Sequence, residues 1–151
     1  MPDRSPVAVW TEPVQADWID YNGHLSEAYY VLVLGHGTDA VMEAVGLGPE
    51  HRSAARVSLF TVEAHLRYLE QVGSTEVLEV RSWVVGSTAK LLWIWHELWA
   101  GGSLRATEEV LGLHVDADAG RAVAFSAAVA ERIAAARVDP PEQTSRRILV
   151  G

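Results

Sequence analysis

The chain has 151 residues and no cysteine, and its formal net charge at pH 7 is −8. This length is typical of one domain with a substantial core, and 49% hydrophobic and 21% charged residues are typical of a globular protein. The acidic balance argues against nucleic-acid binding, because no basic surface exists to replace the counterions of the phosphates. Without cysteine the chain has no disulfide, no thiolate metal site and no cysteine nucleophile.

The N-terminus is polar, and no apolar run approaches the roughly 20 residues that a membrane-spanning helix requires. We therefore expect a cytoplasmic protein without a membrane partner. The chain contains no internal repeat and no low-complexity segment. A single domain is expected over residues 1–151, with its core at about residues 6–137 and a tail at residues 138–151.

The pattern begins with a strand, residues 6–18, in which Glu12-Pro13 marks a bulge or an edge. A polar turn, residues 20–24, then leads into a long apolar segment. Ser26 is expected to cap a helix there, and Gly46 is expected to follow its last turn. The segment between them has no polar stripe, so it predicts a buried helix about 30 Å long.

Two glycines, Gly35 and Gly37, interrupt this helix and predict a kink or close packing near His36. After the helix, residues 48–56 are expected to form a loop. Four strands joined by tight turns follow, at residues 57–68, 75–85, 90–99 and 104–116. The last expected element is a short helix at residues 127–137, capped by a serine. This order predicts an α+β fold, in which a curved antiparallel sheet of about five strands wraps around the long central helix.

Two short motifs resemble those of a known family. They are Asp20-x-x-Gly23 with Ala28-x-Tyr30 at the start of the long helix, and Leu66-Arg67-Tyr68-Leu69 with Gly73 after the next strand. The pattern resembles the hotdog fold of the acyl-CoA thioesterases, in particular the 4-hydroxybenzoyl-CoA thioesterase-like branch. The resemblance implies hydrolysis of an acyl-CoA thioester to the free acid and CoA, with no metal or other cofactor. It also implies a homo-oligomer, a dimer or a tetramer, with active sites between the subunits.

A narrower resemblance runs from about residue 14 to about residue 132. It rests on five short stretches: Trp18–His24, Thr38–Ala40, Phe60–Glu63, His96–Glu97 and Leu113–Asp116. These are similar to the betainyl-CoA thioesterases of carnitine degradation, some of which are fused to carnitine dehydrogenase. The narrower resemblance therefore implies an acyl group that carries a quaternary ammonium.

Asp20 is the first catalytic candidate. A carboxylate beside a helix N-terminus can attack a thioester carbonyl or activate a water molecule. The backbone amides of Ser26, Glu27 and Ala28 would then stabilise the negative charge on the carbonyl oxygen. The structural alternative is that Asp20 only closes an Asx turn before the helix.

Asn22, His24 and Glu63 are further catalytic candidates. Asn-Gly is a common turn dipeptide, but in the related motif the asparagine can orient water or the thioester oxygen. His24 could donate a hydrogen bond to the carbonyl oxygen, pair with Asp20, or be purely structural. Glu63 lies on the polar face of its strand, which is usually a solvated or interface face. The resemblance makes Glu63 a candidate acid/base or a contact for a cationic acyl group.

Three tryptophans, Trp93, Trp95 and Trp99, share one face of their strand by the two-residue period. Such a row is typical of a core or of a dimer interface. The alternative is an aromatic wall for a trimethylammonium group, with Glu97 on the same face adding negative charge. Tyr30, at the helix entry, is a further substrate-binding candidate.

The sequence offers Arg56, Arg67 and Lys90 as cations for the CoA phosphates but does not rank them. A metal site is not expected, because no histidine pair stands at ligand spacing beside a third ligand. Two other functions fit the same fold: hydration of an enoyl-CoA or the reverse dehydration, and non-catalytic binding of an acyl ligand. Release of a free thiol from a CoA ester would separate thioester hydrolysis from both alternatives.

Overall fold

A computed structural model describes residues 5–144 of the chain. Its elements, in chain order, are β1 (Ala8–Pro13), the short 3-10 helix η1 (Ala16–Trp18), α1 (Glu27–Ala44), α2 (Pro49–Ala55), β2 (Val57–Tyr68), β3 (Val77–Ser87), β4 (Leu91–Ala100), β5 (Ser103–Asp116), β6 (Arg121–Ala122) and α3 (Ala127–Ala136). Among the described residues, no helix is long and apolar enough to cross a membrane.

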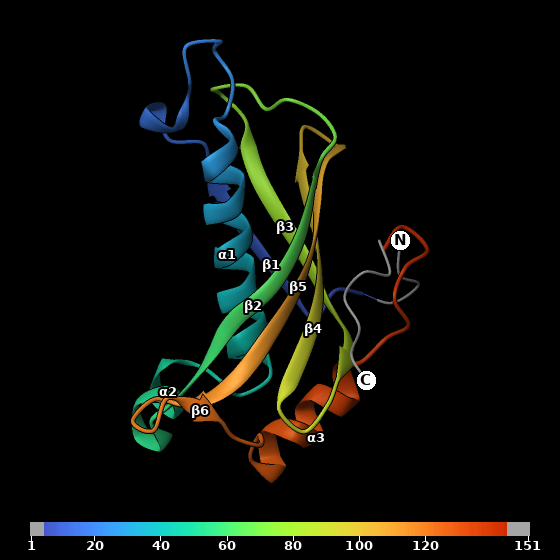
Figure 1. The fold of residues 1–151 in the computed structure, drawn as a ribbon. Helices are drawn as coiled ribbons and strands as arrows, with labels where there is room; N and C mark the ends of the chain where they lie inside the picture. The colour runs from blue at the N-terminus through green and yellow to red at the C-terminus, as the bar shows by residue number, and fades with distance from the viewer. Residues whose placement is uncertain (1–4, 145–151) are drawn as a thin grey trace.

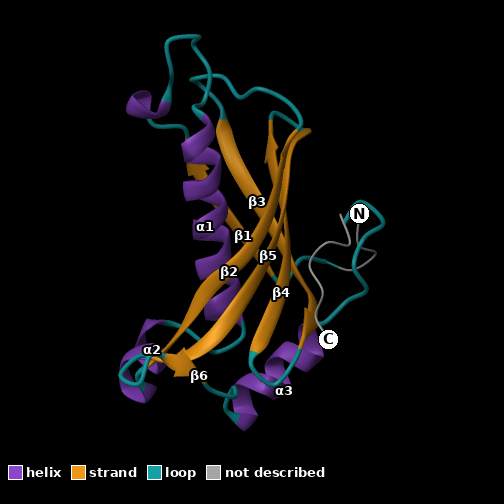
Figure 2. Cartoon of the chain, in the orientation of Figure 1, coloured by secondary structure: helices purple, strands orange, loops and turns teal. Residues whose placement is uncertain are grey.

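The strands pair antiparallel in one sheet, in the order β1-β3-β4-β5-β2, and the short β6 pairs with β5. α1 lies along one face of this sheet, which we call the inner face (Figure 1, Figure 2). The loops that follow β1 and β2 lie at the end where α1 begins, and α2, β6 and α3 lie at the other end (Figure 1). The predicted α+β hotdog architecture is confirmed.

The ends of α1 agree with the cap residues read from the sequence. Ser26 has the extended backbone of an N-cap, although its side chain accepts no hydrogen bond from the helix. Gly46 follows the last turn with a φ of 90°, a conformation that favours glycine. The inner side of α1 packs into the core through apolar side chains: Tyr30, Val33, Leu34, Val41 and Met42.

The prediction that the long apolar helix is buried is only partly met in the single chain. Val31 is 50% exposed and Leu32 is 42% exposed. The helix lies mainly over β1, β3 and β4, so it does not cover the inner face of β5 and β2. One chain therefore leaves an apolar flank of α1 in contact with solvent.

Gly37 lies where α1 crosses β3. A Cβ atom at Gly37 would stand 2.5 Å from Cγ1 of Val80 and 3.3 Å from its Cβ. Valine is stiff about χ1, so this methyl group cannot turn away easily. The missing side chain therefore lets helix and sheet approach, and the predicted close packing near His36 is confirmed. At Gly35, by contrast, an added Cβ would meet nothing within 4 Å.

Gly37→Leu is expected to lower the free energy of unfolding by about 2–3 kcal/mol, because the added side chain overpacks the contact with Val80. Gly35→Ala is the matched control in the same helix. It is expected to raise the free energy of unfolding by about 0.5–1 kcal/mol, since alanine favours a helix over glycine. Denaturant unfolding of both variants measures the two effects, and a Gly37→Leu protein as stable as wild type would contradict this account.

β2 has its predicted bounds, but its alternation is interrupted. The register against β5 shifts between Thr61 and Glu63, so Val62 forms a bulge. Regular alternation along the strand would place Phe60 on the same face as Leu66, but the bulge turns Phe60 to the opposite side of the sheet. The segment predicted as a loop before β2 is the helix α2, with a proline in its first turn, and β6 is not predicted from the sequence.

The face of the sheet opposite α1, the outer face, is partly covered by the segment after α3. Val138 packs against the buried rings of Trp83 and Trp95, and its backbone N–H donates to the carbonyl of Val84 at 2.9 Å. The predicted tail, residues 138–151, therefore starts with a residue that packs against the sheet. The last residues of that tail, 145–151, lie outside the described residues.

Candidate active site

The turn after η1 fixes the carboxylate of Asp20. Its Oδ1 accepts hydrogen bonds from the backbone N–H of Asn22 at 2.9 Å and from that of His24 at 3.4 Å. The backbone N–H of Asp20 donates to the carbonyl of His24 at 2.9 Å, and Gly23, with a φ of 80°, completes the turn. Asp20 thus closes an Asx turn. These bonds occupy one carboxylate oxygen, and Oδ2 has no partner among the described residues.

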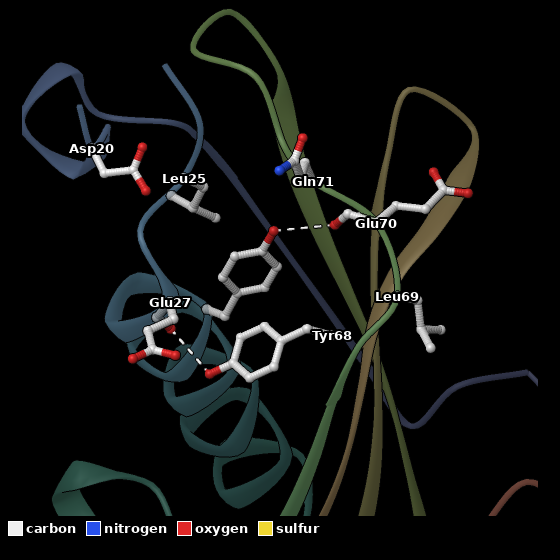
Figure 3. A pocket seen from close by; sticks show the side chains of 8 residues that line it. Asp20, Leu25, Glu27, Tyr68, Leu69, Glu70 and Gln71 are labelled. Carbon is white, nitrogen blue, oxygen red and sulfur yellow. Dashed lines mark hydrogen bonds between the residues drawn. The ribbon is translucent and has the colours of Figure 1, made fainter. Parts of the chain in front are cut away.

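A cavity of about 320 Å³ lies beside this turn, at the start of α1. Its walls come from the turn, from α1 and from the segment after β2 (Figure 3): Asp20, Leu25, Glu27, Tyr30, Tyr68, Leu69, Glu70 and Gln71. Three of these residues are carboxylates, two are tyrosines and none is basic. A cavity of this composition favours a cationic group over an anionic one.

Two tyrosines form one wall of the cavity. The hydroxyl of Tyr30 donates to the carbonyl of Glu70 at 3.1 Å, and that of Tyr68 donates to the carbonyl of Glu27 at 3.3 Å (Figure 3). The two rings meet edge to face, with their centroids 5.0 Å apart. Burial raises the pKa of both tyrosines, so both keep their hydroxyl protons at neutral pH. Tyr30, the predicted substrate-binding residue, therefore lines the same cavity as Asp20.

Of the three backbone amides predicted to form an oxyanion hole, that of the N-cap Ser26 is occupied, and the first two of α1 are free. The backbone N–H of Ser26 donates to the carbonyl of Trp18 at 2.9 Å. The predicted oxyanion role of Ser26 is therefore wrong, because its single amide proton is already bound. The amides of Glu27 and Ala28 have no acceptor within the described part of the chain. These two amides, at the positive end of the helix dipole, can hold a developing oxyanion.

Arg105, on β5, fixes the segment that forms the far wall of the cavity. Its guanidinium donates to Glu76 at 2.6 Å and also to the carbonyl of Gln71. Glu76 accepts a hydrogen bond from the backbone N–H of Gly73 at 2.7 Å, and this bond and the arginine charge hold its pKa below the usual value. Sequence analysis missed this cluster, because Arg105 and Glu76 are 29 positions apart and no motif links them.

His24 has one ring nitrogen without a partner. Its Nδ1 is buried and makes no hydrogen bond within the described residues. The ring does not pair with the carboxylate of Asp20, which binds the backbone of His24 instead. An unpaired buried nitrogen is destabilising and calls for a water molecule, a substrate or a neighbouring subunit. The side chain of Asn22 is exposed at the tip of the turn.

Four candidate residues do not reach this cavity in the single chain. The strand register aligns Glu63 with Trp93, on the outer face of the sheet. Glu97 is only 2% exposed and accepts hydrogen bonds from the indoles of Trp95 at 3.0 Å and Trp99 at 3.1 Å. The tryptophans therefore share a face, as predicted, but the sheet separates them from Asp20. The geometry does not support an acid/base role for Glu63 or a substrate wall at the tryptophans.

The three predicted CoA-binding cations also lie away from the cavity within one chain. Arg56 precedes β2 and Lys90 precedes β4, at the end of the sheet where α1 ends (Figure 1). Arg56 pairs with Asp118 at 2.6 Å, on the surface, and holds the pKa of Asp118 below its usual value. Arg67 is exposed on the outer face of β2. Within residues 5–144, no group of three histidine or carboxylate side chains is placed to hold a metal ion.

The curled antiparallel sheet, its long helix and the acidic cavity at the helix start define a hotdog-fold thioesterase. The chain belongs to the thioesterase-like superfamily, whose profile matches residues 14–133. Thioester hydrolysis of an acyl-CoA to the free acid and CoA, predicted from the sequence motifs, is therefore confirmed as the reaction.

Individual relatives agree with this assignment. The chain is 40% identical over 132 residues to a "Betainyl-CoA thioesterase" of Pseudomonas aeruginosa, covering 85% of this chain and 82% of that protein. It is 38% identical over 125 residues to an "L-carnitine dehydrogenase/betainyl-CoA thioesterase" of Agrobacterium fabrum, covering 82% of this chain but only 26% of that longer protein. A solved Staphylococcus aureus protein in complex with CoA shares the fold, with a TM-score of 0.85, 24% identity, and 100% of this chain and 98% of that chain covered.

Proposed function

We propose that this protein hydrolyses betainyl-CoA to glycine betaine and CoA, as a step of carnitine breakdown. The observation that carries the proposal is the cavity, where the carboxylates of Asp20, Glu27 and Glu70 surround the rings of Tyr30 and Tyr68. A trimethylammonium group donates no strong hydrogen bond, so aromatic faces and negative charge are what bind it. The names of the relatives from Pseudomonas aeruginosa and Agrobacterium fabrum support the same substrate.

In this reaction the free Oδ2 of Asp20 faces the carbonyl carbon of the thioester. As a general base, Asp20 takes a proton from a water molecule whose oxygen attacks that carbon. As a nucleophile, Asp20 attacks the carbon itself and forms an anhydride, which water then hydrolyses. In both routes the amides of Glu27 and Ala28 stabilise the oxyanion, and cleavage of the C–S bond releases the CoA thiolate, which takes up a proton.

The proposed assembly is a twofold dimer through β2, which lies at one edge of the sheet. β2 is 12 residues long, twice the six residues of β1 at the other edge. Phe60 is 54% exposed and Val62 is 53% exposed on this edge strand. A long apolar edge with unpaired backbone groups favours pairing with a second copy. The exposed flank of α1 lies above the same side of the sheet and would then also be covered.

This dimer would bring a cation to the cavity. In a twofold antiparallel pairing, the start of one β2 lies beside the end of the other. Arg56 directly precedes β2, and Tyr68, a cavity residue, ends it. The partner subunit's Arg56 would therefore lie near this chain's cavity, where its guanidinium can bind a CoA phosphate. The ion pair of Arg56 with Asp118 is exposed and therefore weak, so Arg56 can exchange Asp118 for a phosphate.

Betainyl-CoA is expected to show a kcat/KM about tenfold or more above that of 3,3-dimethylbutyryl-CoA, because the cavity recognises the cation. The two esters have the same shape, but only betainyl-CoA carries a positive charge beside the thioester. Measuring the release of free CoA thiol from each ester gives the comparison. Equal values for the two esters would contradict the proposed substrate and leave a general acyl-CoA thioesterase.

A further inference from the structure

Glu108, on β5, is a buried carboxylate that the reaction described above does not use. It is only 6% exposed. Its cross-strand neighbours are Leu66 on β2 and His96 on β4, and such neighbours point to the same side of a sheet. Nε2 of His96 lies 2.8 Å from the hydroxyl of Thr38 on α1. Glu108 therefore faces the inner side of the sheet, the side on which α1 lies.

Glu108 is adjacent to the wall of the cavity. Tyr68, which lines the cavity, lies two positions beyond Leu66 on β2, on the same face as Glu108. A diagonal neighbour of this kind on a sheet is about 7–8 Å away. The two side chains are close enough for the charge of Glu108 to contribute to the raised pKa of Tyr68. The carboxylate of Glu108 thus lies close to Tyr68, one of the two tyrosines of the cavity.

The side of α1 that looks toward Glu108 is lightly packed. Val31, Gly35 and Thr38 occupy one side of the helix, by their spacing of four and three residues. Thr38 contacts β4, so this side looks over β4 and toward β5. Val31 is 50% exposed, and a Cβ added at Gly35 would meet nothing within 4 Å. Glu108 is not itself a wall of the cavity, but an acyl group held there that extends toward β5 along this side of α1 would approach its carboxylate.

The described chain supplies no cation to Glu108. Burial alone raises the pKa of its carboxyl group to about 7. On β4, burial lowers the pKa of His96 to about 3, so its imidazole is neutral and bonds to Ser82 and Thr38. On β2, the titratable group beside Glu108 is the neutral phenol of Tyr68. On α1, the charge that acts on Tyr68 is the carboxylate of Glu27, which helps to raise the pKa of that tyrosine after burial.

We infer that Glu108 adds a buried negative charge to those of Asp20, Glu27 and Glu70 in recognising the trimethylammonium group of the acyl chain, with Tyr30 and Tyr68 supplying the aromatic faces. This inference rests on the proposed function, because it requires a cationic acyl group. It makes Glu108 a residue that determines substrate specificity and gives it no part in the bond-breaking step. The bound cation stabilises the ionised carboxylate, which burial otherwise disfavours.

Glu97 and Glu63, the two carboxylates predicted from the sequence to contact a cationic acyl group, are less suitable for this role. Glu97 is on the outer face, and both of its oxygens already accept indole hydrogen bonds from Trp95 and Trp99. Glu63 is exposed on the outer side of β2, where solvent screens its charge. Glu108 alone of the three combines burial with the inner face.

The first test compares betainyl-CoA with 3,3-dimethylbutyryl-CoA in Glu108→Gln. Glutamine keeps the shape of the side chain but cannot carry a negative charge. The ratio of the two kcat/KM values is expected to fall at least fivefold to tenfold relative to wild type, because only the cationic ester loses an interaction. The neutral ester corrects the ratio for any general effect on folding or turnover. Glu131→Gln, an exposed carboxylate on α3, is the matched control and should leave the ratio unchanged.

The outcomes separate this inference from the proposed function. A wild-type preference for betainyl-CoA that survives Glu108→Gln would overturn the role of Glu108 but keep the substrate. If that preference is instead lost in Glu63→Gln and kept in Glu108→Gln, the anion is Glu63. Equal kcat/KM values in wild type would remove both the proposed substrate and this inference.

The second test uses wild-type protein and so does not depend on the folding of a variant. Protonation of Glu108 removes the negative charge, so recognition of the cation should weaken as the pH falls below about 7. The ratio of kcat/KM for betainyl-CoA to that for the neutral ester is expected to fall at least fivefold between pH 8 and pH 5.5. Titration of groups that act on the thioester carbonyl of both esters cancels in the ratio. A ratio that is constant across this range would overturn the inference.

Discussion

Asp20→Asn is expected to lower the turnover of an acyl-CoA ester by about a hundredfold or more. An amide can neither take a proton from water nor attack a carbonyl carbon, so both proposed roles of Asp20 are lost. The new asparagine would still offer a carbonyl oxygen to the backbone N–H groups of Asn22 and His24, so the turn should keep its shape. The measurement is the rate of thiol release at saturating substrate, together with thermal unfolding of the variant.

Asp17→Asn is the matched control for this variant. Asp17 is an exposed carboxylate in η1, three positions before Asp20, and it does not line the cavity. Its replacement removes the same charge from the same loop and should leave turnover nearly unchanged. If Asp20→Asn also hydrolyses the ester at the wild-type rate, then Asp20 serves only to close the turn. The acid or base would then have to be sought at His24, whose Nδ1 has no partner in the described structure.

The two roles of Asp20 can be distinguished in water enriched in heavy oxygen. If Asp20 is the nucleophile, water hydrolyses the anhydride, and a single turnover can leave heavy oxygen in the carboxylate of Asp20. If Asp20 is a general base, heavy oxygen enters only the released acid. Mass analysis of the peptide that contains Asp20, after one turnover with enzyme in excess, separates the two routes.

Local signals in the sequence were sufficient for most of the fold. The alternation over residues 57–68 gives β2 with its observed ends, and the side chain of Ser126 accepts a hydrogen bond from the backbone of Val129 at the start of α3, as a cap should. Gly46 follows the end of α1, as predicted, because the positive φ there favours glycine. These features depend on a few neighbouring residues, which the sequence displays directly.

Features that depend on distant residues were not accessible in this way. The row of Trp93 and Trp95 with Glu97 is visible in the sequence, but the side of the sheet on which α1 packs is set by the whole topology. The candidates therefore included a row of residues on the far side of the sheet from Asp20. The bulge at Val62 reverses the facing of Phe60, and only the register against β5 reveals it.

The same limit applies to the candidate site itself. The motif at residues 20–24 identified Asp20 and its turn, because all of the bonds that hold this carboxylate are local. The free amides of the helix start were also predicted, except that Ser26 binds the carbonyl of Trp18. Glu70 and Arg105 were not predicted, because their contacts to the cavity cross between β2, β5 and α1. No pattern within a short window of sequence contains that information.

The last prediction tests the shared active site of the proposed dimer. Arg56→Asn should raise KM for CoA esters roughly tenfold, because a charge-assisted contact to a phosphate is lost. Arg56 has a φ of 53°, a left-handed conformation that asparagine tolerates well, so the substitution should not unfold the protein. In a homodimer of either variant, Asp20→Asn or Arg56→Asn, both subunits carry the substitution, so both active sites are impaired.

Mixing the two variants under conditions that allow subunit exchange should restore activity. In a twofold heterodimer, one site contains both substitutions and the other site contains neither, since Asp20 and the partner subunit's Arg56 come from different chains. Random exchange places half of the subunits in heterodimers, so about a quarter of the wild-type kcat/KM should return. If both residues served the same site from one chain, every site would carry one substitution, and mixing would give only the average of the two parents. Restored activity therefore requires that each site be built from two chains, with Asp20 on one and Arg56 on the other.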